Sequence, residues 1–280
     1  MFKVLGLFVR KPGMTKEAFV DRYESPEYGH AQFAIRLCPW QEEYCRNHVR
    51  EVPPITYAHL ETSEAPAPFD VVMVTKARDQ AQAQLTADAL ADPVIGRMIA
   101  EDEEALFDRT KMTIVTVEEC ATPKEQMRSR PVGHTGEPAL KMLGFANRLD
   151  PAIPLDEFIA DYEASLARLV PEILQADGQP IFAGYIRNYV HHDAFANQGH
   201  VAVAPPKADF DIMNEIWFWT EEDFGKFQQA CRVPSVGERM AAEQTRLLDP
   251  ASIRMVFVDE YVHTREMLDA AMAAHDAMTA

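Results

Sequence analysis

The stretch Tyr44-Cys45-Arg46-Asn47-His48-Val49 decides the fold, because it returns in the second half of the chain as Tyr185-Ile186-Arg187-Asn188-Tyr189-Val190. Other segments recur at nearly the same offset: residues 4–8 in 142–145, residues 16–24 in 155–163, and Phe69-Asp70, Pro93 and Asp108 in Phe210-Asp211, Pro234 and Asp249. Two residues related by the offset between Tyr44 and Tyr185 are repeat counterparts. Ordered matches at a nearly constant offset indicate an internal repeat of a whole structural unit. The sequence therefore predicts two homologous domains in one chain.

Both halves show the same order of predicted elements. Apolar, β-branched runs predict strands at 3–10, 43–51, 69–76 and 111–118, and again at 140–147, 182–191, 210–219 and 253–260. Thr15 is a suitable N-cap for a first helix, and Pro93 and Pro234 interrupt helical regions at 79–107 and 221–247. The order βαββαβ is that of a ferredoxin-like unit in an α+β protein. We expect units at 1–119 and 139–263, a Pro- and Gly-rich linker at 120–138, and a helical tail at 264–280.

Charge and composition exclude several classes of function. The 280 residues carry 27 Lys and Arg against 44 Asp and Glu, and the net charge of −17 opposes binding to nucleic acid or an anionic membrane. No uncharged apolar stretch of about 18 residues is present, so no membrane span is expected. The four cysteines are widely spaced, which is typical of a reducing compartment. We expect a soluble cytoplasmic protein that binds neither nucleic acid nor membranes.

The ordered motifs resemble the EthD family of the dimeric α/β-barrel superfamily. In the first half the resemblance is carried by residues 10–15, Glu17, Phe19, Tyr23, His30, residues 44–48, Phe69-Asp70, Asp92-Pro93, Asp102-Glu103, Phe107 and Asp108. In the second half it is carried by Phe158, Tyr162, residues 185–188, Phe210-Asp211, Glu215 and Pro234. The resemblance implies two ferredoxin-like units whose sheets meet face to face in a closed barrel, with the helices outside. Here one chain would supply both units as an intrachain pseudo-dimer, and a further homodimer stays open.

His30 is the first candidate for chemistry. By residue type alone it reads as a surface histidine near a helix end, but it matches the histidine that follows the first helix in the family. A histidine at a cavity mouth can act as general acid or base near neutral pH. The corresponding stretch of the second half, residues 165–171, has no histidine. If His30 is catalytic, the first half therefore holds the working site.

The strand around Tyr44 supplies further candidates. Alternation places Tyr44, Arg46 and His48 on one face and Cys45, Asn47 and Val49 on the other, unless the register slips by one residue. Arg46 would bind an anionic group and Tyr44 or His48 would relay a proton, although a wet polar edge strand would show the same pattern. The substrate-contact candidates are Arg46, Asn47, Asp70, Tyr185, Arg187, Glu215 and Trp217.

Two acidic positions are read differently. Asp70 recurs as Asp211, which favours a turn or cap role. Glu215 lies between aromatic residues of its strand, so it is either an outward-facing edge residue or a partly buried acid with a raised pKa. No metal motif and no phosphate-binding glycine loop occurs, and we expect neither a metal nor a cofactor.

The resemblance implies cofactor-independent proton-transfer chemistry. We expect a lyase (a decarboxylase, dehydratase or retro-aldol enzyme) that acts on a small phenolic or polycyclic aromatic substrate, with His30 as the acid/base and Tyr44 or His48 assisting. An isomerase or cyclase of the same fold and a non-catalytic ligand-binding barrel are the alternatives. A third alternative is a haem protein of the same superfamily, which requires an axial histidine on a helix that faces the sheet.

Overall fold

The structure is a computed structural model of the whole chain. It describes residues 1–52, 63, 65–131, 134–173, 175–176, 179–192 and 208–279. Residues 171–173, 175–176 and 276–279 are described by their backbone only.

Eight antiparallel strands close into a barrel in the order β1-β3-β2-β10-β5-β9-β8-β4. Their bounds are β1 Phe2–Phe8, β2 Glu43–Val49, β3 Val71–Ala77, β4 Thr113–Ala121, β5 Leu140–Ala146, β8 Gly184–His191, β9 Ile212–Phe218 and β10 Arg254–His263. The two halves of the chain contribute four strands each. Pairing of β2 with β10 and of β4 with β8 closes the barrel, because these two ladders join the halves.

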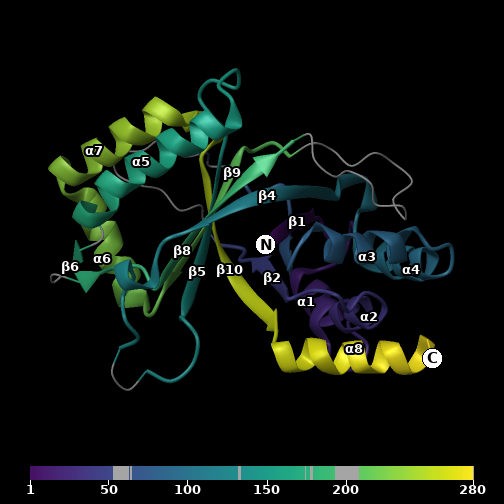
Figure 1. Cartoon of the computed structure of the whole chain (residues 1–280). Helices are drawn as coiled ribbons and strands as arrows, with labels where there is room; N and C mark the ends of the chain where they lie inside the picture. Colours follow the sequence, from purple (N-terminus) through teal and green to yellow (C-terminus); the bar gives the residue numbers. More distant parts are fainter. Residues whose placement is uncertain are drawn as a thin grey trace.

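The helices form two groups on opposite sides of the barrel (Figure 1). The first half supplies α1 Lys16–Glu24, α2 His30–Leu37, α3 Gln80–Ala91 and α4 Ile95–Leu106, and the second half supplies α5 Leu155–Ile173, α6 Glu221–Arg232 and α7 Pro234–Leu247. The C-terminal helix α8, Arg265–Thr279, crosses to the first half and packs on α2. A small ribbon of β6 Gln175–Ala176 and β7 Gln179–Pro180 stands apart from the barrel. No helix in the described ranges is long and apolar enough to cross a membrane.

Local chemistry explains where the helices begin. The Thr15 hydroxyl accepts a hydrogen bond from the Ala18 amide at 3.2 Å and so caps α1, as the sequence predicts. Asp79 caps α3 in the same way, and its carboxylate accepts from the Gln82 amide at 2.8 Å. The predicted helical regions divide next to their prolines, and Pro234 occupies the first turn of α7, where a missing amide proton costs nothing.

Three apolar clusters hold these layers together. One fills the barrel interior and includes Leu5, Val74 and Leu143, and the other two lie between the outer barrel face and the helices of each half. The cluster between the barrel and the first-half helices contains Phe19 and Tyr23 of α1, both fully buried. Apolar area removed from water is the main favourable term in folding, so each helical layer is fixed by its own cluster.

The predicted eight strands and the tail helix are confirmed within a few residues, and the α+β class with a closed barrel is correct. Three features were missed. α2 is a separate helix that begins at His30, β4 runs on to Ala121 into the predicted linker, and β6 and β7 had no counterpart in the prediction. His30 therefore lies at the first turn of a helix, where its buried ring contacts Tyr23 and Phe107.

Candidate functional site

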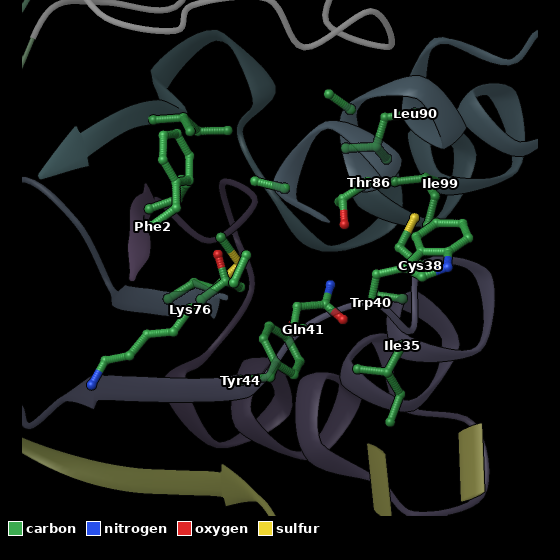
Figure 2. A pocket seen from close by; sticks show the side chains of 18 of the residues that line it. Phe2, Ile35, Cys38, Trp40, Gln41, Tyr44, Lys76, Thr86, Leu90 and Ile99 are labelled. Atoms are coloured by element: carbon green, nitrogen blue, oxygen red, sulfur yellow. The ribbon is translucent and has the colours of Figure 1, made fainter. Parts of the chain in front are cut away.

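A cavity lies between α2, α3 and α4 and the outer face of the first-half strands. It encloses about 1010 Å³, counting the part that opens to solvent. Phe2, Trp40, Leu90 and Ile99 form apolar walls around it, and Tyr44 projects from the strand side (Figure 2). Small-molecule sites are concave and mainly apolar, and this cavity has the same character.

His30 is one of the residues that line this cavity. Its side chain is buried, and its Nδ1 lies 2.6 Å from Oδ2 of Asp102 on α4. Arg22 of α1 pairs with the other oxygen of the same carboxylate. Because one ring nitrogen is held by Asp102 and no residue in the described ranges bonds Nε2, the imidazole has a fixed orientation and one nitrogen left for a ligand.

The electrostatics keep Asp102 ionised. Burial alone would raise the pKa of Asp102, but the hydrogen bond with His30 and the charge of Arg22 lower it below the ordinary value. An ionised carboxylate at Nδ1 accepts a hydrogen bond from the ring N–H and so leaves Nε2 as the nitrogen with the available lone pair. This is the arrangement that commonly orients ligating or proton-transferring histidines.

Tyr44 lies on β2 and lines the same cavity, as the sequence prediction placed it. Burial raises the pKa of its phenol to about 12, so Tyr44 is a neutral hydrogen-bonding group at neutral pH. Gln41 adds a second polar group, and in the described part of the chain its buried Oε1 has no hydrogen-bond partner.

Arg46 and His48 share the face of Tyr44 but do not line the cavity. Both side chains pair with the carboxylate of Glu24 on α1. Arg46 Nη2 lies 2.5 Å from Oε2, and His48 Nε2 lies 2.7 Å from Oε1. His263 at the end of β10 contacts Arg46 Nη1 at 2.5 Å and Gln32 at 2.9 Å. The guanidinium is thus already neutralised by Glu24, which leaves it poorly placed to bind a substrate anion.

The second half repeats this arrangement. Arg187 binds Glu163 at 2.9 and 2.5 Å, and the hydroxyl of Tyr189, at the place of His48, donates to the same carboxylate at 2.5 Å. The same geometry in both halves indicates that the Arg–Glu pair fastens the first helix of each half to the sheet. Tyr185 lies apart from the first cavity and lines a separate second-half cavity.

Asn47 and Asp70 also have structural partners. The Asn47 side-chain amide faces the barrel interior and donates to the Val72 carbonyl at 3.0 Å. Asp70 precedes β3 and accepts from the Arg10 amide at 2.8 Å, and Asp211 does the same for the Arg148 amide at 2.8 Å. The turn role that the repeat favours for this aspartate agrees with this geometry.

Glu215 is neither an outward-facing edge residue nor a partly buried acid with a raised pKa, the two alternatives that the sequence left open. It lies inside the barrel, where Lys3 and Lys141 each donate to it at 2.8 Å. Burial alone would raise its pKa, but the two ammonium groups lower it far below the ordinary value, so the expected raised pKa is wrong. Trp217 stacks over Lys141 at 4.3 Å and donates to Glu260 at 3.1 Å, away from the His30 cavity.

The site therefore brings together His30 and Tyr44 and separates them from the other predicted residues. Asp102, which completes the His30 pair, was not among the candidates, although it belongs to the motif residues quoted above. Its repeat counterpart is Glu243, and the return of a carboxylate at this position was the available signal. The described residues contain no group of three side chains arranged to hold a metal ion.

Comparison with known proteins gives the class first. Residues 150–251 match the family model of the EthD domain. The second half of this chain is thus similar to the EthD domain, which confirms the resemblance read from the sequence. No protein of curated function matches the chain.

Solved structures resemble the whole chain at low identity. A chlorite dismutase from Candidatus Nitrospira defluvii in complex with imidazole is 12% identical, with 96% of this chain and 94% of that chain covered and a TM-score of 0.42. A dye-decolorizing peroxidase from Bacteroides thetaiotaomicron is 7% identical, with coverage of 98% and 95% and a TM-score of 0.48. The predicted cofactor-independent lyase for an aromatic compound is corrected here, because these similar enzymes are a dismutase and a peroxidase and neither is named as a lyase.

Proposed function

We propose that this protein is a haem-binding enzyme whose cofactor would bind in the first-half cavity and would be held at its iron by His30. The observation that carries the proposal is the His30–Asp102 pair, in which a carboxylate holds Nδ1 at 2.6 Å and leaves Nε2 without a bond among the described residues. A haem protein of the resembled superfamily is expected to carry a histidine on a helix that faces the sheet. His30 on α2 meets this expectation.

The donor chemistry and the walls fit the group. A neutral imidazole is a common haem ligand, and a carboxylate at its second nitrogen fixes the tautomer and strengthens the donor. Apolar side chains such as Phe2 and Ile99 would pack against a macrocycle and exclude water. Gln41, with an unpartnered buried oxygen, and Tyr44 are the polar groups available at the wall.

Each residue has a defined part. His30 binds through Nε2, Asp102 keeps the Nδ1 proton in place, and Arg22 holds Asp102 ionised. When bound, a histidine-ligated haem supplies redox chemistry at iron, which the side chains of this cavity cannot perform. Tyr44, with its raised pKa, would offer a hydrogen bond without becoming charged.

We also propose that the two halves, 1–119 and 139–263, are ferredoxin-like units of a tandem-duplicated pseudo-dimer. The support is the equal contribution of four strands per half and the repeated Arg–Glu pair on β2 and β8. A linker between two units raises their effective concentration relative to separate subunits. The first unit would hold the haem and the second would complete the barrel.

Titration of the purified chain with hemin tests the proposal. We expect a Soret band to appear and to saturate at one haem per chain. The His30→Ala variant should lose this band, and added imidazole should restore it by replacing the missing ligand. Circular dichroism confirms that the variant remains folded.

His134→Ala is the matched control, since His134 lies in the segment between the halves, where it contacts the Glu137 carbonyl oxygen and the Trp219 ring and does not line the first-half cavity. It should bind haem as the parent chain does. A saturating Soret band in His30→Ala that matches the parent in position and stoichiometry would contradict the assignment of His30.

A further inference from the structure

The second half contains a cavity of its own, between α5 and α7 and the outer face of β8 and β9. It encloses about 680 Å³, counting the part that opens to solvent. Leu166, Phe182, Phe227 and Met240 provide most of its walls. It corresponds in position to the first-half cavity, because lining residues of the two cavities are repeat counterparts: Met240 of Ile99, and Tyr185 of Tyr44.

The pair that defines the first cavity is altered in the second. Glu243 is the repeat counterpart of Asp102, and the partner of its carboxylate is the Ser165 hydroxyl, which donates at 2.9 Å. Serine thus stands against this carboxylate where histidine stands in the first half. A hydroxyl supplies neither a nitrogen ligand for iron nor a group that titrates near neutral pH, so this pair does not fit haem and does not offer the acid/base group that a histidine would.

The cavity is also electrically neutral. Among its described lining residues, Glu243 alone carries a formal charge at neutral pH, and Arg246 and Arg168 approach it at 3.1 and 3.4 Å. Burial raises the pKa of Tyr162 and Tyr185, so both phenols stay protonated. A charged ligand would lose its hydration here without gaining a counter-charge.

Two polar groups remain for a ligand. The Asn214 side chain lies between the hydroxyls of Tyr162 and Tyr185 with both contacts at a long 3.4 Å. Gln244 Oε1 is buried and has no hydrogen-bond partner among the residues that the structure describes. A buried acceptor without a donor is costly, and such groups are usually satisfied by a ligand or by water.

We propose that the second-half cavity is a binding site for a neutral, mainly apolar molecule that carries a hydroxyl group. The hydroxyl donates to Gln244 Oε1, and the apolar body packs against Met240 and Phe227. The site binds its ligand without converting it, because the carboxylate of Glu243 is bonded by a serine hydroxyl and no histidine lines this cavity among the described residues. This inference stands apart from haem binding, since it rests on a different cavity and different residues.

Isothermal titration with 1-naphthol tests the proposal, because this probe is neutral and apolar and has one hydroxyl donor. The full chain is titrated after its first cavity has been filled by Ile99→Trp. We expect saturable binding of one molecule per chain. Gln244→Met, added to that variant, should weaken binding by about three- to tenfold, the loss expected for one neutral hydrogen bond. It keeps the volume and apolar stem of the side chain.

Two further comparisons make the result decisive. Met240→Trp, the counterpart of Ile99→Trp in the second cavity, should abolish the binding that Ile99→Trp retains. 1-Methoxynaphthalene lacks the hydroxyl donor. It should bind to the Ile99→Trp variant, which keeps Gln244, as weakly as 1-naphthol binds to the variant that also carries Gln244→Met. The proposal is overturned if Ile99→Trp alone removes all binding, or if the methoxy compound and 1-naphthol bind equally well.

Discussion

At the residue scale, the histidines of the first half differ in what they face. His30 has its Nδ1 paired with Asp102 and lines a cavity. His48 has its Nε2 paired with Glu24, and its buried Nδ1, which has no partner among the described residues, does not face that cavity. His48 and His263 are nearly sealed from solvent. His48 and His263 hold α1, β2 and β10 together through Glu24 and Arg46, and His30 lines the cavity.

Replacement of Asp102 should act through His30. In Asp102→Asn the amide no longer attracts the Nδ1 proton as an ionised carboxylate does, so the imidazole becomes a weaker donor and less firmly oriented. We expect haem affinity to fall by about 10- to 100-fold, as is typical when such a partner is removed. Hemin titration measures the change, and Asp161→Asn on the exposed face of α5 is the control. Unchanged affinity in Asp102→Asn would show that the carboxylate does not support the ligand.

The buried histidines predict loss of stability in acid. Burial and the charge of Arg46 lower the pKa of His263 to about 4 in the folded chain. Between pH 6.5, the ordinary pKa of histidine, and pH 4, this side chain therefore binds a proton in the unfolded chain but not in the folded chain. The free energy of unfolding is therefore unaffected by this group above pH 6.5 and falls as the pH drops toward 4. We expect a loss of about 1–3 kcal/mol from this group.

Urea denaturation at pH 7.5 and pH 4.5 measures the effect. The His263→Gln variant should be less sensitive to pH than the parent chain, because glutamine does not titrate. An equal pH dependence in the two proteins would contradict the lowered pKa of His263.

At the element scale, α8 stabilises the first-half site from behind. Leu268 is 1% exposed and packs in the same apolar cluster as Ile35 of α2, the helix that begins at His30. Figure 1 shows α8 lying along the first-half helices although it follows the last strand of the second half. The C-terminal helix thus couples the end of the chain to the position of His30.

Truncation of Leu268 should therefore be costly. Leu268→Ala removes buried methyl groups and leaves a void against α2, and we expect a loss of about 2–5 kcal/mol in the free energy of unfolding. Met267→Ala on the exposed side of the same helix should change it by less than about 0.5 kcal/mol. Denaturant unfolding compares the two, and similar small losses would mean that α8 does not pack as described.

The elements were more predictable than their contacts. Alternation in Tyr44-Cys45-Arg46 assigned the two faces of β2 correctly, and the repeat indicated the order of the strands along each half, because both signals are local or periodic. The partners of these side chains were not predictable. Asp102 reaches His30 across 72 residues and Lys3 reaches Glu215 across 212, and no local pattern encodes such pairings.

At the scale of the whole molecule, a charge network crosses the barrel interior between the halves. Lys3 of β1 and Lys141 of β5 share Glu215 of β9, and each lysine has a second carboxylate, Glu119 or Glu260. The two lysines are 2% and 4% exposed. The network is asymmetric, because Val74 of β3 stands at the position that matches Glu215.

Removal of the shared carboxylate should destabilise the barrel. Glu215→Val leaves two buried ammonium groups with one partner each, and we expect a loss of about 3 kcal/mol, the lower end for a broken buried ion pair. Replacing all three residues, with Lys3→Met and Lys141→Met added to Glu215→Val, should recover most of that loss because no buried charge is left unpaired. Urea denaturation distinguishes the variants. A triple variant less stable than Glu215→Val would contradict this account.

The central claim is that His30 ligates haem in the first-half cavity. Resonance Raman spectroscopy of the ferrous, hemin-reconstituted chain tests it most directly, because the iron–histidine stretching band reports that bond. The account predicts a band in the parent chain that shifts to lower frequency in Asp102→Asn and is absent in His30→Ala. A band that persists unchanged in His30→Ala, or a chain that takes up no haem while His30 is intact, would contradict it.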